Sequence, residues 1–183
     1  MLQREVGQAM RLQPCRRRFD RSDDPRVRRG AGSRPFDGEG VRGEPLTMVS
    51  NGVLNHWFLS HAIARELGHE TNGRGARSGS TVSASSTNFA FEPGEVSPED
   101  LLRSVGNGLY VTEVIGQGVN MVTGEYSRGA SGFRIENGEL KEAISEVTIA
   151  GNLKDMFLNL TLANDVDRSF TVAAPTLAIT GMT

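Results

Sequence analysis

The chain has 183 residues, a formal net charge of −2 and a single cysteine, Cys15. This charge gives no reason to expect nucleic acid or a membrane as partner, and one cysteine excludes an internal disulfide framework and fits a cytoplasmic location. No apolar run approaches the ~18 residues that span a bilayer, and the first 19 residues are too polar for the core of a signal peptide.

The N-terminal end differs in composition from the rest, because residues 1–43 contain eleven arginines and no lysine. A nucleic-acid-binding arm and a leader outside the domain are both compatible with this bias. Residues 13–18 show no helical or strand periodicity and carry no aromatic residue for base stacking, which favours the leader. We therefore expect a disordered leader over residues 1–19 and one domain over residues 20–183.

The first half of the domain contains clear turn and cap signals. Glycines and prolines predict a loop over residues 29–40. Asn51-Gly52, between the apolar runs 46–50 and 53–59, predicts a hairpin with a type I′ turn. Residues 60–67 predict a short helix, with Ser60 as N-cap and Gly68 after its end.

The middle of the chain begins with a polar segment. Residues 69–87 are rich in Ser, Gly, Thr, Asn and Arg, and we expect a mobile loop because such a composition buries little apolar surface. Residues 88–94 predict a strand that ends in a turn. Ser97 followed by Pro98 and Asp100 predicts a helix start.

The second half is rich in strands. Residues 109–115 predict a buried strand, and Asn137-Gly138 predicts a second hairpin between 133–136 and 139–149. Apolar residues on one face predict a helix over 152–162, and further strands are expected at 170–173 and 177–180. The predicted fold is β-rich α+β, with twisted antiparallel sheets, open or closing toward a barrel, and two or three short helices.

The residue types of the common catalytic sites do not come together in the sequence. The histidines, His56, His61 and His69, lack the spacing of a metal-binding helix, so we expect no metal site and no catalytic residue in this chain. Cys15 falls in the predicted leader, away from a partner histidine. Gly-x-Gly-x-x-Gly at residues 38–43 follows no predicted strand, and we interpret it as a chance match in a loop.

A glycine-rich segment carries the best candidate for binding. Tyr126, Ser127 and Arg128 offer a phenol, a hydroxyl and a guanidinium beside Gly129, which lets a ligand backbone approach closely. The alternative is a structural Arg–Glu pair inside the sheet. Arg34 and Asp37 either anchor their loop or line a cleft. The candidate peptide- or partner-binding residues are therefore Tyr126, Ser127, Arg128, Gly129, Asn120, Arg34 and Asp37.

Several motifs resemble the TldD/PmbA family, whose members are also called modulators of DNA gyrase. They are Asp24-Pro25, Gly30-Ala31-Gly32-Ser33-Arg34-Pro35-Phe36-Asp37-Gly38-Glu39-Gly40, Val119-Asn120 with Thr123-Gly124-x-Tyr126-Ser127-Arg128-Gly129, Ile149-Ala150-Gly151-Asn152-Leu153-Lys154-Asp155-Met156, and Gly181-Met182-Thr183. The resemblance covers residues 20–183 and is to the C-terminal domain of the family alone.

This resemblance implies a function. The family contains a subunit with a His-Glu-x-x-x-His helix and a late cysteine that bind zinc for proteolysis, and a PmbA-like (TldE-like) subunit without them. Because the chain has no cysteine after Cys15, it is similar to the PmbA-like subunit. We expect a non-catalytic partner of a TldD-like metallopeptidase subunit, or a homodimer, that handles unfolded peptides, with zinc held by the partner. A metallopeptidase in its own right and a non-functional gene fragment are the alternatives.

Overall fold

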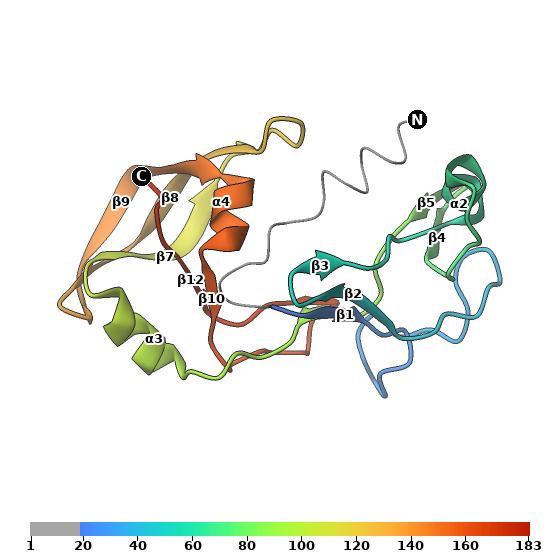
Figure 1. Cartoon of the computed structure of the whole chain (residues 1–183), viewed down its shortest axis with the longest axis horizontal. Coiled ribbons are helices and arrows are strands. Elements are labelled where there is room, and N and C mark those ends of the chain that lie inside the picture. Colours follow the sequence, from blue (N-terminus) through green and yellow to red (C-terminus); the bar gives the residue numbers. More distant parts are fainter. Residues whose placement is uncertain (1–18) are drawn as a thin grey trace. The chain divides into compact units, whose positions relative to one another are not determined.

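The computed structural model describes residues 19–183; Cys15 and residues 1–18 of the predicted leader lie outside the described residues, whereas Phe19, predicted as the last leader residue, is buried (Figure 1). By their contacts the described residues form two compact units, one of residues 19–93 and 166–175 and one of residues 94–165 and 176–183. Within the described residues the chain is rich in strands and has three helices, and none of its sheets closes on itself, so the β-rich α+β prediction is confirmed in its open-sheet form.

The first unit is built on a five-stranded sheet with the order β11-β6-β1-β2-β3. Its pairs are antiparallel except β11 with β6, which is parallel. A separate hairpin and one helix complete the unit. The elements are β1 (Arg21–Asp23), β2 (Leu46–Ser50), β3 (Val53–Leu54), α2 (His61–Leu67), β4 (Gly75–Ser78), β5 (Thr81–Ala84), β6 (Phe89–Phe91) and β11 (Val172–Ala173).

Local signals in this unit act as the sequence predicts. Asn51 and Gly52 both have positive φ, 52° and 74°, as a type I′ turn requires between β2 and β3. Strand β3 is shorter than predicted and ends at Leu54. The Ser60 side chain accepts a hydrogen bond from the Ile63 N–H, and Gly68 closes α2 in the left-handed conformation.

The prediction of a mobile loop over residues 69–87 is wrong. Strands β4 and β5 pair through this segment, and the side chain of Arg74 has no exposed surface. Its guanidinium donates to the Asp23 carboxylate and to the Glu44 carbonyl, and the same carboxylate accepts from the N–H and hydroxyl of Thr87. A polar network therefore orders a segment that has little apolar surface to bury.

The second unit contains a three-stranded antiparallel sheet of β7 (Gly108–Ile115), β8 (Glu125–Glu136) and β9 (Glu139–Asn152), which Figure 1 shows side by side. A two-stranded sheet pairs β10 (Leu160–Leu162) with β12 (Leu177–Ile179). The helices are α3 (Pro98–Val105) and α4 (Leu153–Leu158). Ser97 caps α3 by accepting from the Asp100 N–H, as predicted.

Two predictions for this unit need correction. Strand β7 is mostly exposed rather than buried. The predicted helix over 152–162 begins at its expected cap, Asn152, but ends at Leu158, because residues 160–162 pair with β12 instead. Across the described residues, no helix is long and apolar enough to cross a membrane.

Candidate functional site

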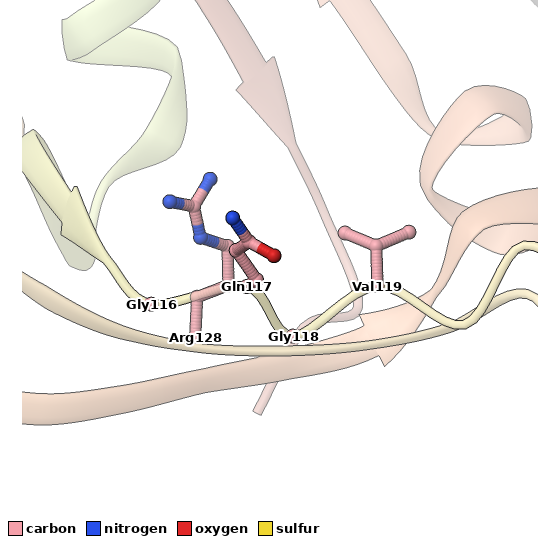
Figure 2. A pocket seen from close by; sticks show the side chains of 5 residues that line it. All are labelled: Gly116, Gln117, Gly118, Val119 and Arg128. Atoms are coloured by element: carbon pink, nitrogen blue, oxygen red, sulfur yellow. The ribbon is translucent and has the colours of Figure 1, made fainter.

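The loop between β7 and β8 borders a pocket of about 310 Å³ (Figure 2). Gly116, with φ of +85°, ends β7, and Gly124, with φ of +80°, begins the approach to β8. Both values lie in the region that glycine adopts at little cost. The pocket lining consists of Gly116, Gln117, Gly118, Val119 and Arg128.

The loop returns as a partner of β8. The Ser127 N–H donates to the Gly118 carbonyl at 2.7 Å, and the Asn120 N–H donates to the Glu125 carbonyl at 2.8 Å. A β-carbon at Gly118 would lie 1.5 Å from the Ser127 carbonyl oxygen, so no other residue fits this approach without movement of the backbone. Gly118 therefore fixes how closely the loop lies against β8.

Because of this pairing, the main-chain N–H and C=O groups of Val119 face away from β8. The two hydrogen bonds flank the bridge between Val119 and Tyr126. In an antiparallel pair of this type the N–H and C=O of the bridging residue point away from its partner strand. The main-chain groups of Val119 therefore face outward, on the same side of β8 as β7, which is an edge strand of its sheet.

The tip of the loop is fixed by Asn120. Its side-chain oxygen accepts from the Val122 and Thr123 N–H groups at 2.9 and 3.2 Å, and its carbonyl accepts from the Gly124 N–H. Met121 and Val122 lie at this tip with 82% and 95% of their surface exposed. Asn120, a predicted binding residue, thus holds two apolar side chains out into solvent.

The predicted four-residue unit is divided between the two faces of β8. Side chains alternate along a strand, so Tyr126 and Arg128 share one face, and Ser127 and Gly129 belong to the other. A β-carbon at Gly129 would be 3.7 Å from its nearest neighbour, an ordinary contact, so packing does not require glycine there. Only Arg128 of these four lines the pocket.

Arg128 does not form the Arg–Glu pair that was its structural alternative. Within residues 19–183 no ion pair involves its guanidinium, whose Nη2 donates to the Val114 carbonyl at a long 3.4 Å. Its Nε is buried without a hydrogen-bond partner among the described residues. A buried donor left unpaired is unfavourable.

Arg34 and Asp37 belong to the first compact unit. Asp37 accepts hydrogen bonds from the N–H groups of Glu39, Val41 and Gly75, so it anchors its loop. Burial acts to raise the pKa of Asp37, but these hydrogen bonds and the charge of Arg34 together hold that pKa below its ordinary value. The Arg34 guanidinium has two buried nitrogens, Nε and Nη2, without a hydrogen-bond partner in the described part of the chain.

Two features of these sites were not predicted. The buried Asp23–Arg74 pair joins residues that lie 51 positions apart, and no local pattern marks it. Gln117 belongs to the pocket, although its only signal is its place between two glycines.

The family resemblance assigns zinc to the partner subunit and not to this chain. Within residues 19–183 no group of three or more His, Cys, Asp or Glu side chains is placed to hold a metal ion. No chemical step through a metal is therefore assigned to these side chains.

Comparison with known proteins covers nearly the whole chain. Residues 15–183 match the family model described as "PmbA/TldA metallopeptidase C-terminal domain". The chain is 42% identical over 146 residues to metalloprotease PmbA of Escherichia coli O157:H7, covering 79% of this chain and 31% of that protein. It is 41% identical over 151 residues to a metalloprotease PmbA homologue of Haemophilus influenzae, covering 81% and 32%.

The chain is also similar to a solved structure. The crystal structure of a putative modulator of a DNA gyrase from Thermotoga maritima superposes with a TM-score of 0.77 at 34% identity, over 88% of this chain and 37% of that one. The chain thus spans about a third of the length of the curated relatives that it matches.

Proposed function

Since the chain belongs to the PmbA/TldD metallopeptidase family, we propose that it serves as the C-terminal part of a PmbA-like, non-catalytic subunit. In this proposal it pairs with a TldD-like zinc subunit in the cytoplasm and holds unfolded peptide substrates for that subunit. The 42% identity to a protein named PmbA supports the choice of subunit type.

The single observation that carries the peptide-binding role is the outward main-chain edge at Val119, next to the pocket. An extended peptide adds to such an edge through main-chain hydrogen bonds, with little regard for its own sequence. That mode suits a protein that handles unfolded chains, because these share a backbone and differ in side chains.

The exposed tip of the loop supports a role in pairing with another subunit. The turn that carries Met121 and Val122 is hydrogen-bonded to the Asn120 side chain, and both apolar side chains project into solvent. Exposed apolar side chains are typical of interaction sites. We therefore assign this tip to the contact with the TldD-like subunit or with a second copy of the chain.

Co-purification tests the proposal. A tagged chain is expressed together with a subunit that carries the His-Glu-x-x-x-His helix, and the stoichiometry of the purified complex is measured. We expect a stable complex, which Val122→Asp weakens at least ~10-fold because it places a charge in an apolar contact. Leu140→Asp, an exposed apolar residue on β9, is the matched control and leaves the complex intact. Absence of a complex with the unaltered chain would contradict the proposal.

The names of the relatives, which are called metalloproteases, favour one second candidate, a metallopeptidase in its own right. Zinc content and cleavage of an unfolded peptide by the purified chain decide between the two. One zinc per chain together with cleavage in the absence of another subunit would establish the second candidate.

A further inference from the structure

The pocket beside the Val119 edge contains a positive charge without a counter-ion. The Arg128 guanidinium is half-buried, its Nε is enclosed without a partner, and no carboxylate of residues 19–183 forms an ion pair with it. The other arginine of this sheet is different: Arg134, on the same strand, pairs with both Glu136 and Glu142. Arg128 is thus a cation that lines a pocket and has no counter-ion among the described residues.

The register of the loop brings a second polar group to the same place. Because Val119 lies opposite Tyr126, Gln117 lies opposite Arg128 two positions along the antiparallel pair. In Figure 2 the Gln117 and Arg128 side chains extend to the same side of the backbone, and both line the pocket. The guanidinium supplies a planar set of donors, and the amide of Gln117 adds a donor or an acceptor next to it.

The Arg128 side chain leans toward β7. Its Nη2 contacts the carbonyl of Val114, a residue of the edge strand β7 that pairs with Ala130, so the side chain reaches from β8 toward the β7 side of the sheet. A peptide strand added beside Val119 would lie one strand spacing, ~4.8 Å, beyond the loop. The guanidinium therefore lies on the β7 side of β8, which is also the side on which a peptide added beside Val119 would lie.

We propose that this pocket binds a carboxylate of an extended peptide on the guanidinium of Arg128, with Gln117 beside it. An arginine fork matches the two oxygens of a carboxylate, which accept two parallel hydrogen bonds. The pocket, of about 310 Å³, has room for a carboxylate group. The carboxylate comes either from the C-terminal end of the peptide or from an aspartate or glutamate side chain.

This inference rests on the proposed function, because it names the group that the peptide site selects. It adds a preference that main-chain hydrogen bonding alone does not produce. Peptides of many different sequences would bind, each in the position that places an acidic group opposite Gln117.

Peptide binding measured by fluorescence anisotropy tests the inference. Three labelled octapeptides share one neutral sequence: one with a free C-terminal acid, one with a C-terminal amide, and an amide with a single aspartate. We expect the full chain to bind at least one carboxylate-bearing peptide ~10-fold or more tightly than the neutral amide, the usual effect of a charged hydrogen bond. Whether the free acid or the aspartate peptide is preferred identifies the source of the carboxylate.

Variants assign the preference to Arg128. Arg128→Met retains length and apolar contact but removes the charge, and it should bind all three peptides equally. Arg128→Lys should retain part of the preference, because a lysine keeps the charge and loses the fork. Arg134→Met, the same change on the same strand, is the control and should keep the full preference.

The outcomes separate the two proposals. Equal affinity of the unaltered chain for all three peptides overturns the carboxylate site and leaves main-chain binding standing, even if no variant folds. A preference that survives Arg128→Met assigns the carboxylate to another group and also overturns the inference. Failure to bind any of the three peptides contradicts both the carboxylate site and the peptide-binding role.

Discussion

In the first compact unit, a buried pair of charged residues joins segments that are distant in the sequence. Asp23 and Arg74 have no exposed side-chain surface, yet the hydrogen-bonding groups of Asp23 reach Arg74 and Thr87, and Arg74 also reaches main-chain carbonyls. A buried pair is tolerable when its remaining donors and acceptors are satisfied in this way. Removing one partner leaves the other charge buried and unpaired, at a typical cost of about 3–5 kcal/mol.

Asp37 makes the stability of this unit depend on pH. Its pKa is lower in the folded chain than in the unfolded one, where it is ~3.9, so the carboxylate stabilises the fold above pH ~4 and loses this effect as the pH falls through the lowered value. Asp37→Asn places an NH2 group against main-chain donors and should cost about 1–3 kcal/mol near neutral pH. The difference in the free energy of unfolding between this variant and the unaltered chain should shrink below pH ~4.

Urea unfolding followed by the fluorescence of Trp57, the single tryptophan, measures this difference from pH 7 to pH 3. Glu66→Gln, on the exposed surface of α2, is the control and should follow the unaltered chain throughout. If the free energy of unfolding of Asp37→Asn differs from that of the unaltered chain by the same amount down to pH 3, the charge of the Asp37 carboxylate does not contribute to stability.

At the scale of elements, local signals predicted local structure. The Asn51-Gly52 and Asn137-Gly138 turns and the serine caps of α2 and α3 depend on a few neighbouring residues, and each forms as expected. The predictions that were wrong concern segments whose structure depends on residues far away in the sequence. Residues 160–162 become a strand because β12 pairs with them, and β4–β5 is ordered through Asp23.

At the candidate site, too, local features could be predicted and the spatial arrangement of side chains could not. The glycine-rich composition around Arg128 predicted a close approach of chains, and Gly118 makes one. Ser127 lies on the opposite face from Arg128 because β8 runs through both residues, whereas the two were predicted to form one binding unit. The sequence also does not reveal that Gln117 lies opposite Arg128.

Limited trypsin digestion tests the ordered state of residues 69–87. Arg74 is fully buried, whereas Arg28 and Arg29 are exposed in a turn, so cleavage after Arg28 or Arg29 should precede cleavage after Arg74. Asp23→Asn leaves Arg74 without its ion-pair partner and should bring cleavage after Arg74 forward. Mass spectrometry of early fragments decides the order. Cleavage after Arg74 as fast as after Arg28 would mean that the segment is open, as its composition alone suggests.

At the scale of the whole molecule, the C-terminal segment contributes to both compact units. Strand β11 adds to β6 in the first unit, where Ala173 is buried and Arg168 pairs with Glu92. Strand β12 then pairs with β10 in the second unit, and Thr183 exchanges two main-chain hydrogen bonds with Ala150. Each unit is therefore completed by residues distant in sequence from the rest of it.

Two shortened chains separate these contributions. A chain that ends at Pro175 keeps β11 and loses β12, and it should destabilise the second unit by ~2 kcal/mol or more through lost pairing and burial, while the first unit is unchanged. A chain that ends at Asp165 loses both strands and should destabilise both units. Hydrogen exchange at residues 89–91 and 160–162 reports each unit separately, and Trp57 fluorescence reports the first. Equal loss of protection at both sites in the chain that ends at Pro175 would show that the two units unfold as one.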